Sequence, residues 1–72
     1  MFNSGLGPLS GRQAEVLGQV YSFMFSVRVP RGEKDAALIE EAAAIFRERG
    51  ATLGSIHLRR CITLAEEARS RQ

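Results

Sequence analysis

The 72-residue chain has few of the residues from which metal sites and cross-links are built: one cysteine, Cys61, and one histidine, His57. One cysteine cannot form an intrachain disulfide, and one of each cannot supply the four ligands of a structural zinc site. No apolar stretch approaches the roughly 20 residues that cross a bilayer. No glycine-rich loop with a following lysine is present to hold nucleotide phosphates. We therefore expect no metal, no cofactor, no membrane partner and no enzymatic activity.

Signals for export are also missing. Residues 1–9 lack the basic region and the apolar run of a secretory signal. An unpaired cysteine suits a reducing compartment. We therefore expect a cytoplasmic protein.

The charge of the chain is mildly basic and uneven. The formal net charge is +2, made up of +1 over residues 1–30, −1 over residues 31–50 and +2 over residues 51–72. A fold that brought residues 24–28 beside the start of the last segment would create a basic face suited to phosphates. An ordinary solvated surface fits the same net charge, so the charge does not decide between a phosphate-binding face and an ordinary surface.

Residues 10–20 have the features of a short amphipathic helix. Ser10 is followed three residues later by Gln13, which is the spacing of a capping box. Apolar side chains then recur at helical spacing as far as Val20. Residues 1–9 contain two glycines and a proline, and we expect them to form an irregular arm.

Two further helices are expected in the second half of the chain. Glu33–Arg49 is rich in good helix formers, and Gly50 follows it as the expected residue C′. A last helix begins at Thr52 or Ser55, either of which can cap it, and runs to about Arg69.

Residues 21–29 alternate with a period of two. The odd positions are all aromatic or β-branched, whereas the even positions are Ser22, Met24, Ser26 and Arg28. This pattern predicts a half-buried strand, which Pro30 ends because it has no amide hydrogen.

One strand needs a partner, because even an isolated hairpin is marginally stable in water. The simplest partner is the same strand of a second copy across a two-fold axis. A chain this short, which buries only about 60% of its unfolded surface, also gains stability by oligomerisation. We therefore expect a homodimer whose ribbon turns Phe25, Val27 and Val29 inward.

The order of these elements resembles a known family. The stretch Phe25–Pro30 (FSVRVP), an Ala/Glu-rich helix, Gly50–Leu53 (GATL) and a further helix resemble the ribbon-helix-helix DNA-binding family, which includes the Arc and MetJ repressors. The likeness covers residues 23–69. Within it, residues 35–44 (DAALIEEAAA) resemble the first helix of antitoxins in the family. The implied fold is mainly α with one short strand: a ribbon-helix-helix homodimer with an extra N-terminal helical segment.

The resemblance divides the chain into an N-terminal arm and helix, residues 1–20, and a DNA-binding domain, residues 21–72. The span from residue 30 to residue 50 is longer than in the shortest family members, which leaves the register of the first family helix open. Residues 1–20 have no counterpart in the minimal family. They are expected to be a DNA-contacting arm, an added helix or an element that binds a protein partner.

The resemblance also implies a function, namely sequence-specific binding to double-stranded DNA by a transcriptional repressor, an antitoxin, or a plasmid or phage regulator. The outward residues Met24, Ser26 and Arg28 would enter the major groove, where arginine reads guanine. Thr52 and Ser55, at the amino end of the last helix, would dock on a phosphate.

Two alternatives stay open. Leu9–Leu17 (LSGRQAEVL) resembles the opening helix of several helix-turn-helix repressors; residues 10–28 would then form one helix, and Thr52–Arg60 would belong to a recognition helix. That alternative requires almost no strand. The second is a helical protein-interaction module, a partner binder or inhibitor, that does not use DNA.

His57 and Cys61 have the four-residue spacing of a metal pair or of a nucleophile with its base. Neither a third ligand nor an acidic residue that orients the base accompanies them. The pattern favours Cys61 as a small buried apolar residue.

Overall fold

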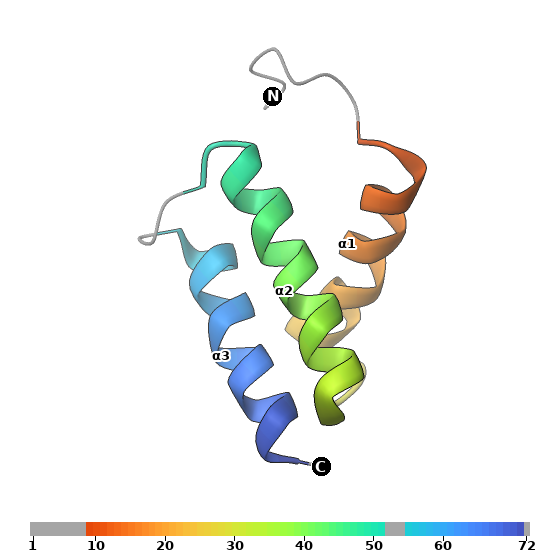
Figure 1. Cartoon of the computed structure of the whole chain (residues 1–72), viewed down its shortest axis with the longest axis vertical. Coiled ribbons are helices and arrows are strands. Elements are labelled where there is room, and N and C mark those ends of the chain that lie inside the picture. Colours follow the sequence, from red (N-terminus) through yellow and green to blue (C-terminus); the bar gives the residue numbers. More distant parts are fainter. Residues whose placement is uncertain (1–8, 52–54, 72) are drawn as a thin grey trace.

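The protein is a bundle of three helices. The structure, a computed structural model, describes residues 9–51 and 55–71. It contains α1 (Gly11–Met24), α2 (Gly32–Glu48) and α3 (Ile56–Ser70), with no strand in the described ranges. Consecutive helices run in opposite directions, with α2 between the other two (Figure 1). α2 packs closely along α3, whereas α1 and α3 contact each other less. None of the three helices has the length and apolar content needed to cross a membrane.

The predicted starts of α1 and α3 are confirmed, and α2 begins at Gly32, one residue before the predicted Glu33. At α1 the capping box is complete: Ser10 Oγ accepts the Gln13 amide at 3.1 Å, and Gln13 Oε1 accepts the Ser10 amide at 3.3 Å. At α3 the N-cap is Ser55, although its side chain makes no capping hydrogen bond. Thr52, the other candidate for this position, lies outside the described residues.

The core combines small side chains on α2 and α3 with larger ones from all three helices. Four alanines, Ala42, Ala43, Ala65 and Ala68, are at most 5% exposed, which lets α2 and α3 approach closely. All three helices also contribute larger side chains, and those that are at most 2% exposed are Val16, Val20, Phe23, Ile39, Leu58 and Leu64. All belong to one continuous cluster.

Ion pairs join the helices at the surface. Arg69 on α3 lies 2.8 Å from Glu33 and 2.6 Å from Glu40, both on α2. Arg12 on α1 lies 2.8 Å from Glu41. The hydrogen bonds from these arginines lower the pKa of Glu40 and of Glu41 below its ordinary value.

The prediction of a strand at residues 21–29 is wrong, and the ribbon-helix-helix fold is wrong with it. Residues 21–24 are the last turn of α1, and Phe25 is its C-cap. Ser26 has a left-handed backbone, with φ of 63°. Its amide donates to the Phe23 carbonyl at 3.2 Å, and the Val27 amide donates to the Ser22 carbonyl at 2.8 Å. These two bonds form a Schellman motif, in which a left-handed residue ends the helix.

The burial of this segment also differs from the strand prediction. Phe25, Val27 and Val29, predicted to face inward, are 72%, 75% and 63% exposed. Phe23 is 1% exposed because it lies on the core side of α1. The alternation of residue types therefore does not correspond to two faces of a strand.

Candidate functional site

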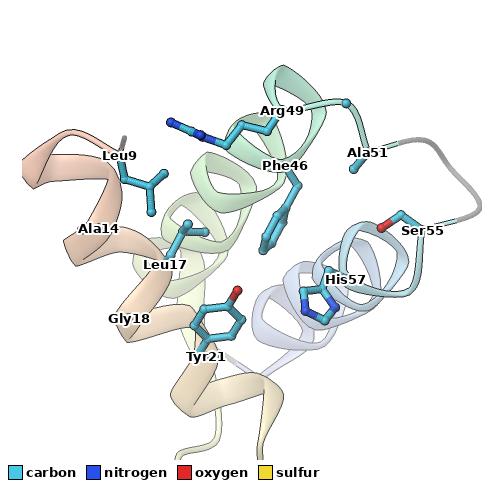
Figure 2. A pocket seen from close by; sticks show the side chains of 11 residues that line it. Leu9, Ala14, Leu17, Gly18, Tyr21, Phe46, Arg49, Ala51, Ser55 and His57 are labelled. Atoms are coloured by element: carbon cyan, nitrogen blue, oxygen red, sulfur yellow. The ribbon is translucent and has the colours of Figure 1, made fainter. Parts of the chain in front are cut away.

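An open pocket lies where the three helices come together near the end of α2. Its volume is about 660 Å³, within the range of ligand-binding clefts. The walls are mainly apolar, and the lining residues include Leu9, Leu17, Gly18, Tyr21, Phe46 and His57. Figure 2 shows α1 on one side and the first turn of α3 on the other, with side chains from both directed toward the space between them. No carboxylate lines this pocket within residues 9–51 and 55–71.

Three aromatic rings from three different helices meet at the pocket. The His57 ring lies edge-on to Tyr21, with centroids 6.0 Å apart, and to Phe46, at 5.5 Å. Tyr21 and Phe46 are 6.5 Å apart and tilted by 60°. These are the edge-to-face arrangements that aromatic rings prefer. Contacts among the rings therefore fix the shape of this wall.

The end of α2 determines where the Phe46 ring is placed. Gly50 has a φ of 99°, and the Ala51 amide donates to the Phe46 carbonyl at 2.9 Å. With the bond from the Gly50 amide to the Arg47 carbonyl at 3.0 Å, this is a second Schellman motif, and the prediction of Gly50 as residue C′ is confirmed. The chain turns directly after the helix and brings Ala51 to the rim of the pocket.

Gly18 leaves an opening in the α1 wall. It lies in the middle of α1, where glycine costs about 1 kcal/mol relative to alanine. A Cβ added at this position would meet no atom within 4 Å. The space is therefore open, and a larger side chain at residue 18 would extend into the pocket.

The residues predicted to read DNA are not displayed together. Met24 is half-buried at the end of α1 and packs against the core. Ser26 is exposed at the Schellman turn. Arg28 is exposed, but its guanidinium carbon lies 4.9 Å from the centroid of the Phe23 ring. The three therefore occupy a helix end and a loop and do not form one face of a ribbon.

The predicted phosphate-docking end of α3 opens onto the pocket. Ser55 is half-buried and lines the pocket. The structure therefore sets this helix end against Phe46 and Tyr21.

The helix-turn-helix alternative correctly expects no strand, but α2 and α3 are antiparallel neighbours (Figure 1). A helix-turn-helix motif needs a crossing of about 90–120°.

His57 and Cys61 do not form a reactive pair. Cys61 is fully buried, as predicted, and burial raises its pKa to about 11. A thiol with so high a pKa is almost entirely protonated near neutral pH and is a poor nucleophile. The His57 ring instead packs on the aromatic side chains of the pocket.

The sequence singles out Ser55 and His57 among the pocket residues, though in other roles, and it does not single out Tyr21 or Phe46. Phe46 belongs to the apolar stripe of a helix, and Tyr21 belongs to the supposed strand. One usable signal was present: Tyr21 and Phe25 are four residues apart, which places both rings on one side of a helix, where they stack at 5.8 Å.

Comparisons with models of known protein families, with curated proteins and with solved structures find no match for this chain.

Proposed function

We propose that this protein is a non-catalytic interaction module that binds an amphipathic helix of another protein in the pocket between its three helices. The observation that carries the proposal is the open pocket of about 660 Å³ with an aromatic wall. Grooves of this kind bind the apolar face of a helix through anchors spaced by three or four residues. Tyr21, Phe46 and His57 would contact such anchors.

The apolar surface extends beyond the pocket, which favours a helix over a compact small molecule. The Phe25 ring is 72% exposed and stacks on Tyr21 with centroids 5.8 Å apart. It adds one helical turn of apolar surface along α1, about 5–6 Å. A helix with successive anchors can use both the pocket and this extension.

The charges near the pocket also constrain the partner. Arg49, a cation, is among the described lining residues, and none of these residues is a carboxylate that could pair with a lysine or arginine. A cationic group brought into the pocket would therefore lose water without gaining an ionic partner. We infer that the anchors of the partner helix are apolar or aromatic.

A protein partner is favoured over DNA by the nature of the exposed surface. Arg12, Arg69 and Arg71 are engaged with carboxylates. Among the exposed arginines without a described ion pair, Arg28 and Arg31 lie in the loop after α1, whereas Arg59 and Arg60 lie in the first turns of α3. The features that stand out are instead apolar: the pocket and exposed side chains near the end of α1. Protein interfaces concentrate their binding energy in such aromatic sites.

A pocket-filling variant tests the proposal. Helical peptides are selected from a display library on the wild-type protein, and their Kd values are measured by fluorescence anisotropy. Gly18→Leu places a side chain in the pocket and raises the helix propensity of α1, so the fold is retained. We expect it to weaken binding of the selected peptides by at least about tenfold, or 1.4 kcal/mol.

Gln19→Leu is the matched control. It adds the same side chain at the next position of α1, where the residue is exposed and lines a different groove. We expect binding within about twofold of wild type, since exposed substitutions away from a site have small effects. Equal binding by both leucine variants, or selection of no peptide that depends on residue 18, would overturn the proposal.

A further inference from the structure

The loop between α1 and α2 directs large apolar side chains into solvent. Phe25, Val27 and Val29 are 72%, 75% and 63% exposed. In a Schellman motif the residue after the left-handed position commonly packs its apolar side chain back on the helix. Here the helix offers Ser22 at that place, and Val27 remains exposed.

This loop is nevertheless held in one conformation by contacts along its length. The Arg28 amide donates to the Ser22 carbonyl at 3.0 Å, and the Arg28 guanidinium lies over the Phe23 ring. The Arg31 amide donates to Asp35 Oδ2 at 2.9 Å. Arg71 donates to the carbonyl of Pro30, a buried residue, at 3.2 Å. A loop that is already ordered loses little conformational entropy on binding.

Basic residues flank the exposed valines along the chain, in the loop and in the first turn of α2. Arg28, Arg31 and Lys34 are exposed, and none of their charged side-chain groups has a described ion pair. Of the nearby acidic residues, Glu33 pairs with Arg69, whereas Asp35 accepts the neutral Arg31 amide and keeps its negative charge, so the basic groups outnumber the unpaired carboxylate. This end of the bundle therefore combines an apolar tip with basic groups that can bind anions.

We propose that the loop binds the surface of an anionic lipid bilayer. Phe25, Val27 and Val29 enter the boundary between headgroups and acyl chains, and Arg31 and Lys34 lie at the level of the lipid phosphates. This contact is peripheral, so it does not require the membrane-spanning segment whose absence led to the expectation of no membrane partner. Phe25 belongs to both proposed surfaces, but Val27, Val29, Arg31 and Lys34 do not line the pocket, so variants at these four positions test the bilayer contact apart from peptide binding.

The size and charge of the patch favour a bilayer over a protein. A stable protein interface uses about 20–30 residues on each side, far more than one loop offers. A second copy placed across a two-fold axis would also bring Arg28 and Arg31 close to their own counterparts, which is repulsive. A bilayer requires neither a large complementary area nor a matching shape.

A tryptophan probe tests the insertion, because the chain contains no tryptophan. Val27→Trp is mixed with vesicles of equal parts phosphatidylglycerol and phosphatidylcholine. We expect a blue shift of its emission and quenching by brominated lipid. Ile56→Trp is the control, since Ile56 is 81% exposed and begins α3, whose start lies at the opposite end of the bundle from the loop between α1 and α2 (Figure 1). We expect the emission of Ile56→Trp to stay unchanged when vesicles are added. The emission of Val27→Trp should also stay unchanged when inorganic phosphate is added in place of vesicles.

Vesicle co-sedimentation supplies a second measurement. We expect Arg31→Gln/Lys34→Gln to lower the partition constant roughly 25-fold, since each basic residue near an anionic leaflet contributes about fivefold. Val27→Ser/Val29→Ser loses binding as well, whereas Gly18→Leu binds vesicles as wild type does.

Three results would overturn the proposal. The first is an equal response of the Val27→Trp and Ile56→Trp emission to vesicles. The second is a blue shift of Val27→Trp with soluble poly-glutamate in place of vesicles, which would assign the loop to an acidic protein. The third is a dimer of the wild-type chain that Val27→Ser/Val29→Ser converts to a monomer, which would assign the loop to a second copy.

Discussion

The amide of Val27 donates a hydrogen bond to the carbonyl oxygen of Ser22 at 2.8 Å, across the end of α1. This bond is possible only because Ser26, between them, has a left-handed backbone with φ of 63°. Glycine usually occupies that position, as Gly50 does at the end of α2. Ser26 therefore ends α1 in a backbone conformation that is costly for a residue other than glycine. The loop with the exposed valines begins at this residue.

Replacing this serine by glycine should stabilise the protein. Ser26→Gly removes a left-handed penalty of about 1–2 kcal/mol and adds a glycine entropy cost of about 0.5–1 kcal/mol. We expect a net gain of roughly 0.5–1 kcal/mol in the free energy of unfolding, measured by urea denaturation. Gly50→Ala, which makes the opposite change at the matching position, should lose about 1 kcal/mol or more. A loss of stability in Ser26→Gly would argue against the Schellman turn.

Two arginine variants test whether the loop reads DNA. Arg28→Ala and Arg59→Ala remove the same charge, and both residues are exposed. Because Arg28 is not part of a ribbon, we expect equal effects on binding to duplex DNA at low salt, with any affinity falling steeply as salt is added. A preferred DNA sequence that only Arg28→Ala loses, at about 1–3 kcal/mol per contact, would contradict this expectation.

Stability should fall at high pH because Cys61 is buried. Burial raises the folded pKa of its thiol to about 11, from an ordinary value of 9.0. The unfolded chain therefore releases its proton first, and the stability present below pH 9 is lost as pH rises toward 11, by about 2–3 kcal/mol. Urea denaturation of wild type and Cys61→Ala over this range measures the effect. The two curves should converge as pH rises; parallel curves would be inconsistent with a buried thiol.

The Arg69 ion pairs should make stability depend on acid pH. The hydrogen bond from Arg69 lowers the folded pKa of Glu40 below 4.5, so its contribution is present above pH 4.5 and is lost as pH falls through the folded pKa. Arg69→Gln should therefore be less stable than wild type at neutral pH, and the difference should shrink in acid. Arg59→Gln, which changes an exposed residue without a described ion pair, should show no such convergence in thermal denaturation.

The helices could be predicted from the sequence because their signals are local. The capping box at Ser10 and the left-handed Gly50 depend on residues within one or two turns, and both are present as expected. The apolar stripe of α2 likewise predicts which side of this helix is buried. In such segments propensity, capping and periodicity all indicate the same structure.

The segment at residues 21–29 was mispredicted because two different structures share one pattern. Its first half is helical and contributes Phe23 to the core, whereas its second half is a loop with exposed valines. Alternating residue types indicate a strand only when one face is buried. Ser26 gives little local warning of a helix end, since serine rarely adopts a left-handed backbone. The pocket could not be predicted, because Tyr21 and His57 meet only through the packing of α1 against α3.

Nuclear Overhauser contacts in the complex with a selected peptide give a direct test of whether the aromatic pocket binds a partner helix. We expect intermolecular contacts from apolar peptide side chains to the ring protons of Tyr21, Phe46 and His57. Gly18→Leu should abolish these contacts while its own amide spectrum stays that of a folded bundle. Contacts confined to the outer face of α3, at Ile56 and neighbouring residues, would contradict the account.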